Sequence, residues 1–220
     1  MRTTILKLVK RIDAVTQLPQ PIYEFGAGHT VGQESRGKVR DFFRGRNYVA
    51  SDMEPGIGVD RVLDVQRLDL PSEVAGTAIL LETIEHVEKP WLALQELHRV
   101  LAPGGVVILS SVMFFPVHLF PDDYWRFTAS GFRSLLAPFD DCVVTAAGMR
   151  TLPHSVVGIG FKAPVAAEMK GKIADAVEAW RRHDATSWKE IALAALPPWM
   201  LVKAYDWYVA RNIERAKKKG

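Results

Sequence analysis

A glycine turn and three acidic residues are the first candidates for chemistry. Glu24 lies just before the turn Gly26-Ala27-Gly28, and Asp52 and Asp64 each end a short apolar run further along the chain. Glycines let a ligand approach the backbone, and the N-terminus of a following helix directs its N–H groups at that ligand. A carboxylate at a strand end can accept ribose hydroxyls or an adenine amino group. Three such acids predict a nucleoside site, although each alone also fits an ordinary turn.

Two other kinds of site are disfavoured. The dinucleotide fingerprint G-x-G-x-x-G requires a third glycine where this chain has Val31, so an NAD-dependent oxidoreductase ranks last. The single cysteine, Cys142, excludes an intramolecular disulfide framework and any multi-cysteine zinc or iron–sulfur site, and we expect no metal. One cysteine also fits a reducing compartment, and we expect it to lie in the core on a late strand.

Short apolar runs alternate with helical stretches over most of the chain. This alternation predicts an α/β fold of the Rossmann-like, doubly wound kind: a mostly parallel sheet with helices on both faces. The expected strands are 22–25, 48–51, 61–63, 78–81, 106–112 and 156–161. The expected helices are an N-terminal one at 3–18, then 34–45, 90–101 and 129–137, and a C-terminal helical extension with helices at 163–182, 187–196 and 199–216.

The formal net charge of +3 is unevenly distributed. Residues 1–12 and 201–220 each carry +4, which leaves −5 on residues 13–200. Basic ends on an acidic body argue against a nucleic-acid groove, so no nucleic-acid partner is expected. The two ends either pack on the domain as helices with a solvated tail or dock on an anionic membrane surface.

No membrane span or secretory signal is expected. Residues 1–20 lack a continuous apolar block. The longest uncharged run near the C-terminus, Ile191 to Val202, has 12 residues and contains Pro197-Pro198, whereas a bilayer span needs about 20 apolar residues. The expected location is cytoplasmic, with peripheral membrane contact as the alternative.

Two later segments carry a family resemblance. One is Glu82-Thr83-Ile84-Glu85-His86-Val87, and the other runs from Arg99 through Pro103-Gly104-Gly105. Together with the glycine turn and Asp52, they resemble the class I S-adenosylmethionine-dependent methyltransferases, in particular a bacterial small-molecule group, over roughly residues 20–145. A nucleic-acid methyltransferase is disfavoured because no N/D-P-P-Y/F motif follows the fourth strand.

The resemblance implies a seven-stranded sheet whose last strand is antiparallel, and S-adenosylmethionine as the cofactor. The cofactor contacts that it implies are Glu24, Gly26, Ala27, Gly28 and His29 around the methionine part, Asp52 at the ribose, Met53, Asp64 and Val65 around the adenine, and Leu81 and Glu82 along the route to the sulfonium. Two departures stand out: Thr30 replaces a common third glycine, and Gly76-Thr77 replace the aspartate usual before the fourth strand.

The segment from His118 to Thr128 is similar to the P-x-D-Y-W-R-F-T stretch of a subgroup often associated with surface-polysaccharide biosynthesis. We expect it to form an acceptor wall, with substrate contacts from Asp123, Tyr124, Trp125 and Arg126. The alternative is a structural cap in which Trp125 and Phe127 are core and Thr128 caps helix 129–137. Both interpretations can hold for different side chains.

Methyl transfer is a displacement at a cationic sulfur, so the protein mainly aligns the acceptor and excludes water. A hydroxyl acceptor also needs a base, for which His86 is the first candidate and His118 the second. A carboxylate acceptor would need none.

The sequence therefore predicts a methyltransferase domain over residues 1–162 and a helical extension over 163–220. The predicted activity is methyl transfer to a small-molecule or glycan-biosynthesis acceptor, at oxygen or nitrogen. The alternatives are a lipid-linked or quinone-like acceptor at a membrane surface, and a cofactor-binding partner module without activity. The sequence does not predict the oligomeric state.

Overall fold

The computed structural model describes residues 3–28, 39–115, 117–118, 122–149 and 152–185, with residues 197, 199–200, 203 and 207. Seven strands form one sheet in the order β3-β2-β1-β4-β5-β7-β6. Their bounds are β1 Ile22–Phe25, β2 Tyr48–Asp52, β3 Arg61–Val62, β4 Ala75–Leu81, β5 Leu101–Val112, β6 Asp141–Met149 and β7 Leu152–Phe161. Neighbours from β3 to β5 pair in parallel, and β7 pairs antiparallel with both β5 and β6. The predicted Rossmann-like fold with an antiparallel last strand is confirmed.

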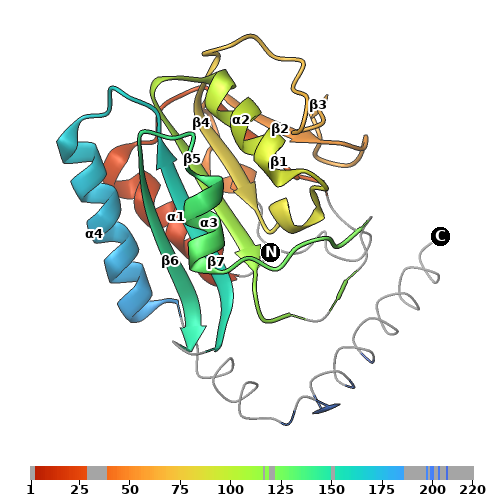
Figure 1. Ribbon diagram of the computed structural model, residues 1–220. Helices are drawn as coiled ribbons and strands as arrows, with labels where there is room; N and C mark the ends of the chain where they lie inside the picture. The colour runs from red at the N-terminus through yellow and green to blue at the C-terminus, as the bar shows by residue number, and fades with distance from the viewer. Residues whose placement is uncertain are drawn as a thin grey trace.

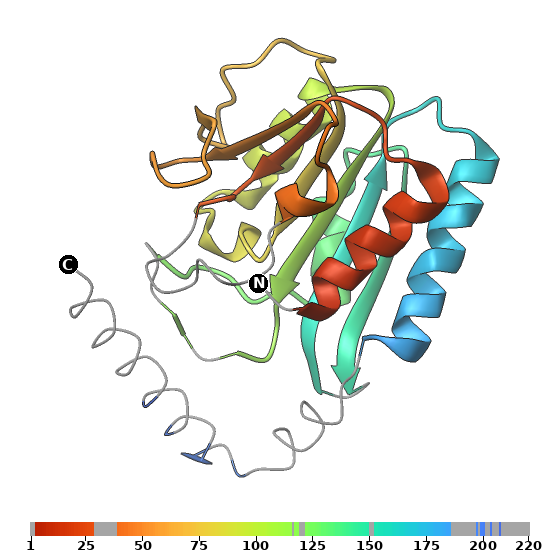
Figure 2. The same cartoon turned by 180° about the vertical axis from the view of Figure 1, so that it is seen from behind.

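Helices cover both faces of the sheet. Figures 1 and 2, which view the molecule from opposite sides, show α2 (Pro90–Val100) and α3 (Ala129–Leu135) on one face and α1 (Thr3–Thr16) and α4 (Ala167–His183) on the other. Two short 3₁₀ helices, η1 (Val39–Phe42) and η2 (Ile84–His86), lie in connections.

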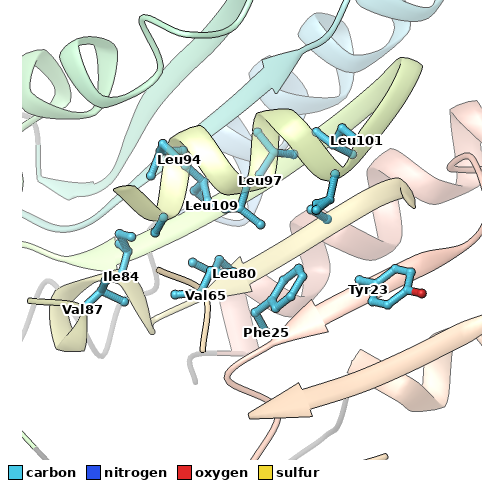
Figure 3. Close-up of a cluster of buried hydrophobic side chains, with 14 of the residues drawn as sticks. Tyr23, Phe25, Val65, Leu80, Ile84, Val87, Leu94, Leu97, Leu101 and Leu109 are labelled. Carbon is cyan, nitrogen blue, oxygen red and sulfur yellow. The ribbon is translucent and has the colours of Figure 1, made fainter. Parts of the chain in front are cut away.

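The central strands are buried on both faces, so their side chains alternate between two apolar clusters. Leu80, Leu109 and Phe25 of the sheet lie in one cluster with Leu97 of α2 (Figure 3). Ile79 and Ile108 point to the opposite face, where the apolar stripes of α1 and α4 cover them. The apolar stripe of α1 is therefore buried in the domain.

A hydrogen bond and two ion pairs join the α4 region to helix α1. The fully buried Trp180 of α4 donates its indole Nε1–H to the Thr4 carbonyl at 2.7 Å. Asp184, just after α4, pairs with Lys7 at 2.9 Å and with Arg11 at 2.8 Å. Helix α4 thus shares a buried cluster with α1 and the sheet, while the expected domain boundary after residue 162 stays a prediction.

Several predicted boundaries were wrong. Within the described part of the helix predicted at 34–45, residues 39–45, the structure has the short η1 and a turn at Gly45, whose φ is +79°; residues 34–38 lie outside the described residues. Helix α3 ends at Leu135 rather than at residue 137, because Pro138 disfavours helical backbone in the residue before it. Strands β5 and β7 begin earlier than predicted. The helix predicted at 187–196, and most of that at 199–216, lie outside the described residues.

The missing aspartate before the fourth strand has a structural replacement. The Thr77 hydroxyl donates to the Pro19 carbonyl at 2.8 Å. A Cβ on Gly76 would lie 2.7 Å from the Gln20 carbonyl oxygen, so only glycine fits beside that backbone. Gly76 and Thr77 both lie inside β4, where they fasten the strand to the segment that leads into β1.

Among the described residues, no helix combines the length and apolar character needed to cross a bilayer.

Candidate cofactor and acceptor site

The sheet register brings the ends of β1, β2 and β4 together. Phe25, the last residue of β1, pairs with Ser51 of β2 on one side and Leu80 of β4 on the other. The amides of Gly26 and Ala27 both donate to the Ser51 carbonyl, at 2.9 and 3.0 Å. The glycine turn is therefore anchored to β2 before the chain leaves the sheet.

Asp52 is held directly against this turn. Its Oδ2 accepts a hydrogen bond from the Gly28 amide at 2.8 Å, and its Oδ1 accepts one from the Glu54 amide at 3.3 Å. A carboxylate has about four acceptor positions, so lone pairs remain for ligand hydroxyls. The aspartate is thus oriented beside the turn, as the ribose assignment requires.

Gly26 lies against the loop that follows β4. Its φ is +81°, and a Cβ there would lie 2.2 Å from Oγ1 of Thr83. Thr83 in turn donates to the Leu81 carbonyl at 3.1 Å. Glu82, between them, has a φ of +50° and donates its amide to Ser110 of β5. The glycine turn at 26–28 and the segment at 81–83 therefore form one surface.

Glu24 is buried within β1. The Tyr48 hydroxyl donates to its Oε2. Burial raises the pKa of the Glu24 carboxyl to about 8, an effect that Arg40 opposes and Asp52 reinforces. A carboxyl with a pKa near neutrality can be either protonated or charged at neutral pH.

Some of the expected adenine contacts have exposed side chains, and others have side chains buried in the core. The Leu63 amide donates to the Asp52 carbonyl at 2.8 Å, which places the segment after β3 beside the end of β2. Asp64 accepts from the Gln66 amide at 2.8 Å, and the Met53 side chain is 54% exposed on the rim. Val65, like Leu81, has a buried side chain in the core, so it reaches a ligand only through its backbone. His29 lies outside the described residues.

The two candidate bases meet on the acceptor side. His86 ends η2 and His118 follows β5, yet their ring centroids are 4.8 Å apart and nearly perpendicular. His86 Nδ1 contacts the Asp122 carbonyl, and His118 Nδ1 lies 3.0 Å from Asp123 Oδ2. Both imidazoles are held by the segment that was expected to form the acceptor wall.

Asp123 and Arg126 bind each other. The Asp123 side chain is fully buried and accepts two hydrogen bonds from the Arg126 guanidinium, at 2.5 and 2.6 Å. Burial alone would raise the pKa of Asp123, but the hydrogen bonds from Arg126 and from the His118 amide outweigh it and lower the pKa to about 2. This ion pair shapes the segment; direct acceptor contacts from these two residues stay a prediction.

Tyr124 and Trp125 present their rings at the surface, 47% and 37% exposed. The Tyr124 amide donates to the Glu85 carbonyl at 2.9 Å, and Trp125 Nε1 donates to the Val87 carbonyl at 3.0 Å. Trp91 of α2 meets Trp125 edge to face at 6.2 Å between centroids. Aromatic faces therefore flank the loop after β4.

The last residues of the same segment support the fold. Phe127 is buried in the core, and the Thr128 hydroxyl caps α3 by accepting from the Gly131 amide at 3.1 Å. The predicted cap is confirmed, while the prediction that Trp125 is core was wrong, because its ring lies over the loop rather than beneath α3. Cys142 is half-buried on β6 and packs against the core.

Comparisons with known proteins bear on this geometry. Residues 38–109, which span β2 to β5, match the family model described as "Methyltransferase domain". The structure resembles that of the CurJ carbon methyltransferase (16% identity, TM-score 0.54, 72% of this chain and 54% of that chain). It also resembles the PH0226 protein of Pyrococcus horikoshii OT3 (15%, 0.54, 73% and 90%). The fold is that of the class I methyltransferases.

A third solved structure is a Burkholderia thailandensis 1,6-didemethyltoxoflavin-N1-methyltransferase with bound 1,6-didemethyltoxoflavin and S-adenosylhomocysteine (16%, TM-score 0.50, 73% of this chain and 78% of that chain). This chain spans about half the length of the CurJ enzyme. No curated protein sequence matches the chain. The domain match and the fold make S-adenosylmethionine, the methyl donor of this reaction class, the cofactor against which the residues of the site are compared.

The residues present fit this cofactor. The methyltransferase sheet places Asp52, the glycine turn and the loop at 81–83 beside one another, and Cβ atoms on Gly26 or Gly28 would overlap Thr83 or Asp52. The turn therefore leaves backbone, rather than side chains, facing a ligand. Carboxyl groups at Glu24 and Asp52 suit a ligand that combines hydroxyls with positive charge.

Glu85 is a residue of the site for which the sequence predicts no role. Glu85 of η2 is fully buried beside His86, and burial raises the pKa of its carboxyl to about 8. Its sequence signal is weak but identifiable: an acidic residue between Ile84 and His86 in a segment that otherwise has a buried apolar pattern.

Proposed function

We propose that this protein transfers the methyl group of S-adenosylmethionine to oxygen or nitrogen of a small-molecule or glycan-biosynthesis acceptor. The observation that carries the proposal is the contact between Gly28 and Asp52 at the joined ends of β1 and β2. It supports a ligand that lies over the glycine turn with its hydroxyls at Asp52. The fold and the domain match independently support the same reaction class.

The bound cofactor would supply an electrophilic methyl group on a positively charged sulfur. The chain's own residues would hold and orient it: Asp52 would accept hydrogen bonds from the ribose hydroxyls, Glu24 would contact the methionine part, and Met53 would contact the adenine. Alignment of acceptor and donor accounts for most of the rate in such a displacement.

Proton removal from a hydroxyl acceptor falls to His86. With Nδ1–H donating to the Asp122 carbonyl, its Nε2 carries the lone pair that accepts a proton. His118 lies edge-on to the same ring and is the second candidate. The base is required for a hydroxyl and dispensable for a carboxylate acceptor.

The acceptor class follows from the exposed rings of Tyr124, Trp125 and Trp91. Aromatic faces bind planar and sugar rings, and they leave polar atoms at the ring edges free to reach the loop after β4. A ring-bearing acceptor is therefore favoured over an extended aliphatic chain.

The test is methyl transfer from labelled S-adenosylmethionine to a panel of nucleotide sugars, free sugars, phenols and amines. We expect one class to be methylated, and Tyr124→Ala to raise its KM at least fivefold without altering cofactor affinity. Val15→Ala, which alters an exposed apolar residue of α1 outside the wall, is the control. Retained cofactor binding with no transfer to any class would favour the non-catalytic partner module instead.

A second candidate is a lipid-linked or quinone-like acceptor at a membrane surface. Trp199 and Trp207 are each 61% exposed, and Lys203 Nζ lies 5.6 Å from the Trp199 ring centroid. Exposed tryptophan beside lysine suits an anionic interface. Flotation with phosphatidylglycerol vesicles, with and without residues 199–220, separates the candidates: loss of flotation on truncation favours the membrane acceptor, and no flotation of the full chain excludes it.

A further inference from the structure

Three potential metal ligands gather between the loop after β4 and the segment after β5. Glu85 and His86 belong to η2, and His118 lies in the segment that follows β5. One ligand atom of each lies within 4.8 Å of the others. Two ligands on one ion with bonds of about 2.1 Å are at most about 4.2 Å apart, so small side-chain rotations would bring all three onto a single ion.

Glu85 is a buried acidic residue of this group. Its side chain is fully buried, and neither carboxyl oxygen has a hydrogen-bond partner in the part of the chain that the structure describes. A buried, unpartnered carboxyl is costly unless a cation or donor joins it.

One ring nitrogen of each imidazole lies close to an oxygen atom. His86 Nδ1 contacts the Asp122 carbonyl, and His118 Nδ1 lies 3.0 Å from the buried carboxylate of Asp123. Arg126 fixes that carboxylate through two hydrogen bonds. Metal-binding histidines characteristically donate their second ring N–H to a carbonyl or carboxylate, which fixes the tautomer and the ring plane.

We infer that Glu85, His86 and His118 together bind one divalent transition-metal ion of the Zn²⁺ class. Two imidazoles and one carboxylate form a ligand set that leaves a position open on zinc, whereas Mg²⁺ and Ca²⁺ prefer oxygen ligands throughout. This differs from the expectation of no metal, which rested on cysteine spacing alone. A carboxylate and two histidines from separate segments leave no such spacing pattern in the sequence.

The role of the ion rests on the proposed function, although its binding does not. The open position would hold the acceptor hydroxyl, whose pKa the ion lowers so that the proton leaves to solvent. His86 would then act as a ligand rather than as the base. The site thereby selects acceptors that carry a hydroxyl able to bind the ion, beside the rings of Tyr124 and Trp125.

The test is a calorimetric titration of the chelator-treated full chain with ZnCl₂, without cofactor, supported by the visible absorption of Co²⁺. We expect one ion per chain, at least tenfold weaker binding in His118→Ala and Glu85→Gln, and loss of the Co²⁺ bands in both. His183→Ala, which removes an exposed histidine at the end of α4, should bind like the wild type. Thermal unfolding checks that each variant is folded.

Wild-type protein that takes up no ion, or folded Glu85→Gln and His118→Ala that bind it as tightly as wild type, would overturn the site. Titration of the same samples with S-adenosylhomocysteine distinguishes the two proposals. Zn²⁺ binding without cofactor binding would remove the proposed function and keep the metal site. Cofactor binding without Zn²⁺ binding would do the reverse.

Discussion

The Gly28 amide donates to Oδ2 of Asp52 at 2.8 Å, and a Cβ on Gly28 would lie 2.6 Å from that same oxygen. The hydrogen bond and the absence of a side chain thus have one cause, the close approach of the turn to the aspartate. The backbone φ of Gly28 does not itself require glycine, because it lies outside the left-handed region. Glycine is needed at this position for space.

Gly28→Ala should therefore displace the Asp52 carboxylate. We expect S-adenosylhomocysteine to bind at least tenfold more weakly, a loss of about 1.4 kcal/mol, as measured by calorimetry. Gly56→Ala is the matched control, because its new Cβ would meet only Val59, at 3.9 Å. Equal affinities for the two alanine variants would show that the contact between Gly28 and Asp52 does not position a ligand.

Glu24 predicts a pH dependence of stability. Its pKa is raised from 4.5 to about 8 in the folded protein, so the folded state holds this proton more tightly than the unfolded state. The stability that the protonated Glu24 carboxyl provides is complete below pH 4.5, and it is lost as the pH rises to about 8 and the folded protein releases this proton. The free energy of unfolding of wild type, relative to Glu24→Gln, should fall by up to about 1.4 kcal/mol per pH unit in that window.

Urea denaturation at several pH values measures this difference. Glu54→Gln, which alters an exposed glutamate near the same strand end, should give a curve parallel to the wild type. If the Glu24→Gln curve is also parallel, the burial of Glu24 does not perturb its titration.

Much of the fold was predictable because the local signals agree with the tertiary structure. The run from Val106 to Val112 is mostly apolar because β5 is buried on both faces, and Pro90 begins α2 where a missing amide costs nothing. The stretch at 34–45 lacked such agreement: its apolar residues suit one buried face, yet Phe43 packs against Tyr48 and the chain turns at Gly45.

The position of a site residue could be predicted only where that position depends on the strand to which the residue belongs. Glu24 and Asp52 follow from strand ends, which sequence patterns locate. The pairing of Asp123 with Arg126 and the burial of Glu85 depend on segments that meet only in the folded chain. The exposure of Trp125 likewise depends on the position of the loop after β4, which no local pattern encodes.

Trp180→Ala should destabilise the whole domain. The indole is fully buried between α1 and the sheet and donates to Thr4, and such a truncation costs about 3–5 kcal/mol. Trp91→Ala, which alters a half-exposed tryptophan, should cost at most about 1 kcal/mol. A single urea transition that shifts for Trp180→Ala would place α4 inside the folding unit; a separate early transition would support the boundary predicted after residue 162.

Gly171→Ala should stabilise the protein. Gly171 lies inside α4, and nothing lies within 4 Å of the Cβ that alanine would add. Alanine in place of an unstrained helical glycine contributes about 0.5–1 kcal/mol, which urea denaturation resolves. A lower midpoint for Gly171→Ala would indicate an unseen contact at this face of α4.

The measurement that tests the account most directly is a calorimetric titration of the full chain with S-adenosylhomocysteine, with Asp52→Ala in parallel. We predict one binding site per wild-type chain and at least tenfold weaker binding in the variant, because the ribose loses the carboxylate that the Gly28 amide orients. A wild-type chain that releases or absorbs no heat of binding would contradict the proposed cofactor. Equal affinity in Asp52→Ala would contradict the assignment of Asp52.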